Sequence, residues 1–132
     1  MPLQAHYAQT LPKPRFRYTP CIQAGPFYQL AGMIALDAAT GQLEAGGVAA
    51  ETDKIMRNML GALPEYGLRL DQLMIARIFT TRFDQFADIN RIWEGYFPEG
   101  ATPPARTAMG VAALPLGAAV EIEFCFYKEE TP

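Results

Sequence analysis

The feature that most constrains the fold of this chain is the order in which helix-like and strand-like apolar patterns follow one another. Apolar residues recur at helical spacing in two segments, and runs that favour strands precede, separate and follow them. The first stripe comprises Val48, Thr52, Ile55, Met56, Met59, Leu60 and Leu63, and the second comprises Phe83, Phe86, Ile89, Trp93 and Tyr96. A helix with one apolar stripe needs another layer to cover it, so the pattern predicts two helices packed on one face of a sheet.

The two helices have recognisable ends. The first is expected to run for about five turns from residue 48, with Pro64 near its end and Gly67 as its stop. The second is expected over residues 83–97, before Pro98 and Gly100. The polar face of the first helix is expected to carry Glu51, Asp53, Lys54 and Arg57.

The remaining segments favour strands. They are residues 16–23, 27–36, a short piece within 37–43, residues 74–81, and two further strands between residues 105 and 127. Pro20 is expected to place the first strand at an edge or to make it irregular. The order β-β-(β)-α-β-α-β-β predicts a single α+β domain over residues 1–132, with residues 1–15 as a loose leader.

The last strand alternates strictly between apolar and mixed residues. Val120, Ile122, Phe124 and Phe126 take one face, and Glu121, Glu123, Cys125 and Tyr127 take the other. Because the helices need the first face, the second is expected to remain uncovered within one chain. A sheet face of that mixed character is typical of an interface between copies of a protein.

Composition excludes several classes of function. Hydrophobic residues make up 50% of the chain, and the net charge is -3, with Lys and Arg scattered, which argues against a nucleic-acid partner. No window approaches the roughly 18 apolar residues that cross a membrane. Two cysteines without an evident export signal predict a reduced, cytoplasmic protein.

The same composition limits the chemistry. A single histidine argues against a histidine-based triad and a zinc site, and no phosphate-binding loop is present, so no metal or cofactor is expected. Two charged residues beside apolar strands remain as candidate functional residues. Arg106 is either a solvated side chain or a clamp for a carboxylate. Glu121 is either a rim carboxylate, a salt-bridge partner of Arg106, or a general base.

The stretch that contains both residues reads PPARTAMGVAALPLGAAVEIEF, from Pro103 to Phe124. It resembles the signature P-x-R-[ST]-x-x-x-V-x-x-L-P-x-x-x-x-V-E-I-E of the RidA (YjgF) family. Three further segments are similar to family motifs in the same order: LAGMIALDAATGQL, NMLGALPEYGLRLDQLM and FDQFADINRIWEGYF. Together they cover roughly residues 17–127.

The resemblance implies a fold, an assembly and an activity. The fold would be chorismate-mutase-like, and the assembly a homotrimer whose sheets line a central barrel, with three clefts between subunits. The activity would be hydrolysis of reactive enamines or imines, such as 2-aminoacrylate, to 2-oxo acids and ammonia, without a cofactor.

The resemblance also assigns roles to individual residues. It implies that Arg106 holds the substrate carboxylate and that Glu121 orients the attacking water. It places Asn90 and the backbone of Gly32 at the cleft.

Three positions depart from the family pattern as we align it. Cys21 stands where a tyrosine is expected at the cleft, Met33 replaces a glutamine, and Ala108 replaces a cysteine. The backbone N–H of Ala108 remains available for a main-chain contact with the substrate.

Three functions therefore stay open. The first is an imine deaminase. The second is a trimeric protein that binds or senses small carboxylates with little turnover, which Cys21 and Met33 motivate. The third is a ribonuclease, a role attached to some relatives, against which the acidic balance counts.

Overall fold

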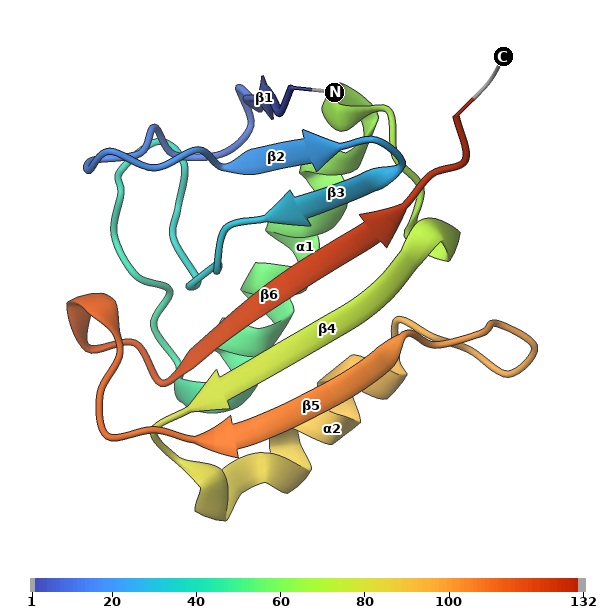
Figure 1. Ribbon diagram of the computed structural model, residues 1–132. Coiled ribbons are helices and arrows are strands. Elements are labelled where there is room, and N and C mark those ends of the chain that lie inside the picture. The colour runs from blue at the N-terminus through green and yellow to red at the C-terminus, as the bar shows by residue number, and fades with distance from the viewer. Residues whose placement is uncertain (1, 131–132) are drawn as a thin grey trace.

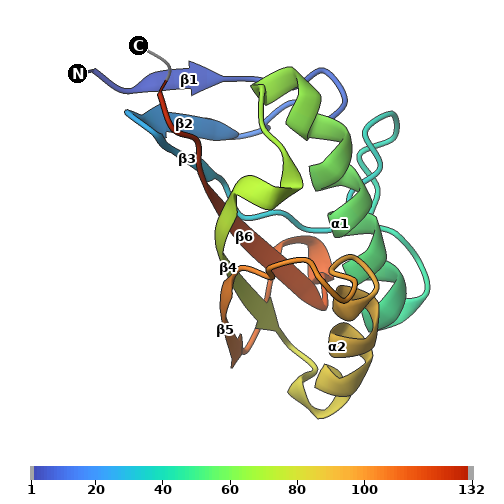
Figure 2. The ribbon, with the colours of Figure 1, turned by 90° about the vertical axis from the view of Figure 1, so that its right-hand side faces the viewer.

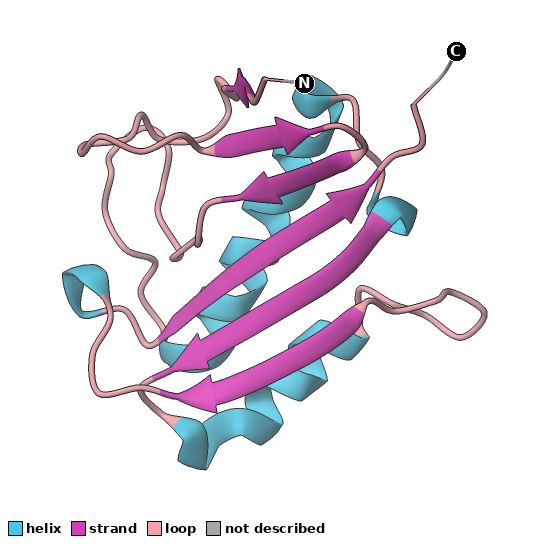
Figure 3. Cartoon of the chain, in the orientation of Figure 1, coloured by secondary structure: helices cyan, strands magenta, loops and turns pink. Residues whose placement is uncertain are grey.

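The computed structural model describes residues 2–130, and Figure 1 shows a sheet with two helices behind it. The sheet has the strand order β1-β2-β3-β6-β4-β5. The strands are β1 Gln4–His6, β2 Cys21–Ala24, β3 Phe27–Leu30, β4 Leu73–Thr80, β5 Ala105–Gly110 and β6 Val120–Tyr127. The helices are α1 Gly47–Tyr66 and α2 Phe86–Glu94 (Figure 3). No helix among the described residues has the length and apolar character to span a membrane.

Both helices lie on the same side of the sheet, as the turned view shows (Figure 2). The burial of β6 alternates as predicted. Val120, Ile122, Phe124 and Phe126 are fully buried beneath the helices, and the residues between them are partly or largely exposed. The predicted α+β class with helices on one face is therefore confirmed, and the other face of the sheet is uncovered within one chain.

The helix ends show where sequence patterns are reliable. Gly67 takes the left-handed conformation, with φ 71, and its N–H bonds to the carbonyls of Leu63 and Pro64, so the predicted stop of α1 is confirmed. The second helix is shorter than predicted, because a 3-10 turn occupies Phe83–Gln85 and α2 begins at Phe86. Phe83 is 49% exposed, and so does not belong to the buried stripe.

Glu51 was expected on the polar face of α1, and that expectation is wrong. Its side chain is buried, and its Oε1 accepts hydrogen bonds from the backbone N–H groups of Ala119 at 2.9 Å and Val120 at 3.2 Å. Burial raises the pKa of the Glu51 carboxyl, and the two N–H groups act in the opposite direction. The carboxyl thus satisfies backbone donors at the start of β6, immediately before Glu121.

Replacing Glu51 with alanine should lower the free energy of unfolding by about 2–4 kcal/mol, because two buried N–H groups lose their acceptor. Urea denaturation measures this change. Glu51→Gln is the matched control, since the amide keeps an oxygen acceptor, and it should lose much less stability. Equal losses in both variants would show that the acceptor is not what Glu51 contributes.

The predicted leader is partly ordered in the sheet. Gln4–His6 forms β1 and pairs antiparallel with β2, so β2 is an inner strand rather than an edge. The backbone N–H groups of Gln9 and Thr10 also bond to the carboxylate of Glu65 in α1. Pro20 lies just before β2, where its missing N–H costs no ladder hydrogen bond. Met1 and residues 131–132 of the predicted domain lie outside the described residues.

The segment after β3 is less regular than the predicted strand over residues 27–36. Regular pairing stops at Leu30, and two isolated bridges follow, one joining Met33 to Ile122 and one joining Leu36 to Leu43. The first bridge holds the chain around Gly32 against β6, next to Glu121.

Candidate functional site

Arg106 lies on β5 and points toward the helices. Its guanidinium donates a 2.8 Å hydrogen bond from Nη2 to Oδ1 of Asn90 in α2. The Cζ atom also sits over the rings of Phe86, at 5.3 Å, and Trp93, at 5.4 Å. Within residues 2–130, no carboxylate forms an ion pair with this arginine. The cation is oriented by neutral groups and remains available to an anion.

Glu121 lies on β6 and points to the uncovered face of the sheet. It is half-buried, and the carboxylate receives no hydrogen bond from the described part of the chain. Burial raises the pKa of the Glu121 carboxyl, and repulsion from Glu123 raises it further. A carboxylate with a raised pKa is a stronger base than an ordinary one, and so is suited to accept a proton from water or a ligand.

Gly32 makes room for this carboxylate. A Cβ added at Gly32 would come within 2.3 Å of Oε2 and 3.0 Å of Cδ of Glu121. Only a residue without a side chain lets Glu121 lie against the backbone here. The structure therefore brings together two of the residues that the resemblance assigned to the cleft.

The register of the sheet places Arg106 and Glu121 on opposite faces within one chain. Arg106 is level with Ala76 of β4, which is fully buried on the helix face. Glu121 is level with Phe79, on the opposite face of the same strand. Strands β5 and β6 are also two strand spacings apart, about 10 Å. One chain thus presents two half-sites on opposite faces, Arg106 with Asn90 and Glu121 with Gly32.

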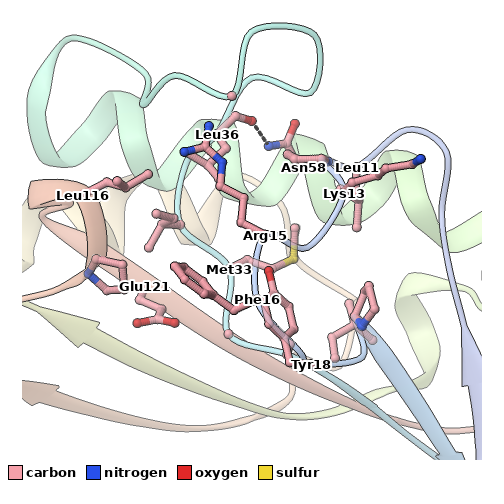
Figure 4. Close-up of a pocket in the computed structure, with 18 residues that line it drawn as sticks. Leu11, Lys13, Arg15, Phe16, Tyr18, Met33, Leu36, Asn58, Leu116 and Glu121 are labelled. Atoms are coloured by element: carbon pink, nitrogen blue, oxygen red, sulfur yellow. Dashed lines mark hydrogen bonds between the residues drawn. The ribbon is translucent and has the colours of Figure 1, made fainter.

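A pocket of about 520 Å³ adjoins the Glu121 half-site (Figure 4). It lies between the segment of residues 11–20, the loop of residues 30–41 and the turn that precedes β6. Its lining includes Tyr18, Gly32, Met33 and Glu121. Its size and mostly apolar lining are typical of a site for a small molecule.

Cys21 does not line this pocket. Its side chain is fully buried in the hydrophobic core, and burial raises the pKa of its thiol to about 12. Tyr18, three residues earlier, does line the pocket and is 53% exposed. Cys21, expected at the cleft, is therefore buried away from the pocket, and the tyrosine that lines the pocket is Tyr18. The sequence pattern gave no signal for Tyr18, because it lies outside the strand of residues 21–24.

The two other departures from the family pattern have different positions. Met33 is half-buried, and its side chain contributes to the pocket lining. Ala108 lies on β5, level with Ile78, and so shares the helix face with Arg106. Ala108 therefore belongs to the half-site of Arg106 and Asn90.

The chain matches known proteins over most of its length. The family model described as Endoribonuclease L-PSP matches residues 8–127. A RutC family protein of Pyrococcus horikoshii is 32% identical over 123 residues, which covers 93% of this chain and 96% of the relative. A mouse protein named 2-iminobutanoate/2-iminopropanoate deaminase is 33% identical over 106 residues, covering 80% of this chain and 77% of the relative.

Solved structures agree with this assignment. RidA from an Antarctic Psychrobacter superposes with a TM-score of 0.86 at 27% identity, covering 94% of this chain and 98% of that one. The YjgF gene product of E. coli has a TM-score of 0.86 at 26% identity, with the same coverage of 94% and 98%. The matched region includes both half-sites. The chain belongs to the Endoribonuclease L-PSP family, the family of the RidA and YjgF proteins.

Proposed function

We propose that this protein hydrolyses reactive enamines or imines of the 2-aminoacrylate type to 2-oxo acids and ammonia. The observation that carries the proposal is the pair of half-sites. One has an oriented guanidinium with no ion-pair partner among residues 2–130, and the other has a half-buried carboxylate beside an apolar pocket. Relatives named 2-iminobutanoate/2-iminopropanoate deaminase support the same reaction class.

The complete site requires more than one copy of the chain, in our proposal a homotrimer. Arg106 and Glu121 are on opposite faces of the sheet and cannot hold one small substrate within a single chain. Placing the β5 edge of one subunit against the uncovered face of the next would bring the two half-sites together. The uncovered face carries exposed apolar side chains, such as Phe27 and Met109, that such packing would bury.

In the proposed reaction, Arg106 binds the substrate carboxylate through two N–H groups, with Asn90 fixing the guanidinium. Glu121 orients a water and takes one of its protons as the water oxygen bonds to the imine carbon. The imine reacts in its protonated form, so this addition gives a neutral carbinolamine. Glu121 returns the proton to its nitrogen and then takes the hydroxyl proton as the C–N bond breaks, so that ammonia leaves with the 2-oxo acid. An enamine first takes a proton on carbon to become the imine. The chemistry is easy once the substrate is positioned, which fits a site with few polar groups.

The test is hydrolysis of imines generated in place, for example 2-aminoacrylate formed by eliminating water from serine. The expected result is loss of the imine faster than its spontaneous hydrolysis, in proportion to protein concentration, with ammonia and 2-oxo acid released in equal amounts. Imine decay at the spontaneous rate, at all protein concentrations, would refute the proposal.

The pH dependence of this activity should respond to Glu123. The carboxylate of Glu123 raises the pKa of Glu121, so removing its charge with Glu123→Gln should lower that pKa. Because the ionised form of Glu121 is the active base, activity falls as pH drops through its pKa. The acid limb of the profile of kcat/KM against pH should therefore move to lower pH in the variant. An acid limb that stays in place would assign it to another group.

The two other functions are now less well supported. Cys21 no longer argues for a binding protein without turnover, because Tyr18 lines the pocket instead. A ribonuclease is the role that the description of the matching family model names, but the net charge of -3 counts against attraction of a phosphate backbone. We further propose a cytoplasmic location, where Cys21 and Cys125, which form no disulfide with each other, would stay reduced.

A further inference from the structure

We infer that the substrate carries a bulky apolar side chain, and that Leu116 selects for it. This inference rests on the proposed function and names the class of imine. It starts from the pocket beside Glu121, which is larger than the smallest imino acids need. Its volume is about 520 Å³, whereas 2-iminopropanoate has only about six non-hydrogen atoms.

The lining determines which kind of side chain fits. The apolar lining includes the side chains of Leu11, Phe16, Met33, Leu36 and Leu116 (Figure 4), and Ile34 is also a lining residue. In our proposal the carboxylate of the substrate is bound by Arg106 of a second copy, outside this pocket. Its reacting carbon then lies near Glu121, so the remainder of the molecule extends over apolar surface. A hydrocarbon or aromatic side chain gains most by leaving water there.

Two cations among the lining residues raise the alternative of an acidic side chain on the substrate. Lys13 and Arg15 are among the lining residues, but both are exposed. An ion pair in that position is screened by water and adds little affinity. Burial of apolar surface therefore contributes more to substrate affinity than an ion pair with Lys13 or Arg15. The test below includes an acidic substrate to check this.

Leu116 is the residue whose conformation points to a role in selection. Its backbone has φ 58 and ψ 23, and it is the one non-glycine residue with positive φ in the part of the chain that the structure describes. The left-handed region is unfavourable for leucine, and glycine adopts it freely. The side chain is nevertheless 60% exposed, so burial in the core of its own chain does not compensate for this conformation.

Function offers a reason for a strained, exposed leucine at this place. Leu116 lies on the Glu121 side of the pocket, in the turn Pro115–Gly117 just before β6 (Figure 4). Met33, Leu36 and Leu116 line the same pocket, so a substrate side chain seated there would also contact Leu116. Leu116 is thus a specificity-determining residue rather than a catalytic one.

The test compares imines made in place by an amino-acid oxidase from leucine, phenylalanine, alanine and glutamate. For the unmodified protein, kcat/KM for the leucine- and phenylalanine-derived imines should exceed that for the alanine-derived imine by about tenfold or more. Equal values, or a preference for the glutamate-derived imine, would overturn the inference and leave the proposed function intact.

Leu116→Gly provides the sharper comparison. It should lower kcat/KM for the leucine-derived imine by about fivefold or more, while the alanine-derived imine changes less than about twofold. Its Tm should be unchanged or higher, since glycine suits the left-handed conformation, so misfolding cannot explain the loss. Leu3→Ala is the matched control, because Leu3 is 65% exposed and does not line the pocket. An unchanged ratio of the two imines in Leu116→Gly would overturn the role of Leu116.

Failure of the proposed function can be separated from failure of the inference. If no imine is hydrolysed above its spontaneous rate, the proposed function fails. Calorimetry with 2-oxo acids then decides the inference alone. Tighter binding of 4-methyl-2-oxopentanoate than of pyruvate supports an apolar side-chain pocket, and equal or reversed affinities overturn it.

Discussion

Arg106→Ala should reduce kcat/KM for imine hydrolysis by about a hundredfold or more, because a bidentate, charge-assisted contact to the substrate carboxylate is lost. The guanidinium is already oriented by Asn90 and by the rings of Phe86 and Trp93, so its removal takes away a prepared binding group. The same assay of imine decay measures the effect.

Two further variants define what Arg106 contributes. Arg106→Lys keeps the charge but not the planar pair of donors, so it should recover only a small part of the activity. Arg91→Ala is the matched control on α2, since Arg91 is exposed and pairs only with Asp88 among the described residues, and it should retain full activity. Undiminished turnover in Arg106→Ala would remove the carboxylate clamp from the mechanism.

Gly32→Ala should nearly abolish turnover while leaving the fold intact. The new Cβ would meet the end of the Glu121 side chain, 2.3 Å from Oε2, and that flexible side chain can rotate away. The cost to stability should be small, but the carboxylate would lose its place beside the pocket. A displacement of about 1 Å can cost about a hundredfold in rate, and we expect a loss of that order here.

Gly61→Ala is the control for this substitution. A Cβ at Gly61 meets nothing within 4 Å, and alanine favours a helix over glycine by about 1 kcal/mol, so this variant should be slightly more stable and fully active. Circular dichroism melting of both variants separates stability from activity. Full turnover in Gly32→Ala would show that the position of Glu121 against the backbone is not needed.

The sequence was sufficient for the layers of the fold and for one half of the site. Strict alternation along residues 120–127 placed Glu121 on the face away from the helices, since burying Val120, Ile122, Phe124 and Phe126 leaves no other choice. The stop of α1 followed from Gly67, whose backbone conformation is local. These features depend on residues that are close together in the sequence, so a single sequence is enough to predict them.

The features that were missed depend on contacts between distant segments. Glu51 looks like a surface residue until the backbone of Ala119 and Val120 meets it. Gln4–His6 has no strand signal of its own and is ordered by pairing with β2. Local patterns contain no information about either contact.

The face of the sheet that Arg106 takes is a further feature that the sequence does not predict. It depends on the parallel register of β5 with β4, in which Arg106 is level with Ala76. Without that register, the sequence does not tell which face of the sheet Arg106 takes. Tyr18 lies three residues before β2 in the sequence, so a tyrosine near this strand was visible. That it lines the pocket depends on how the segment of residues 11–20 folds, which the sequence does not show.

The central claim is that each active site is built from two copies of the chain, and mixing two inactive variants tests it most directly. Arg106→Ala and Glu121→Gln should each be inactive alone. Coexpressed in equal amounts in a ring of three, about a quarter of the interfaces would combine an intact Arg106 with an intact Glu121, so about a quarter of the wild-type activity should return. Mixed oligomers that remain as inactive as either parent would contradict a shared site.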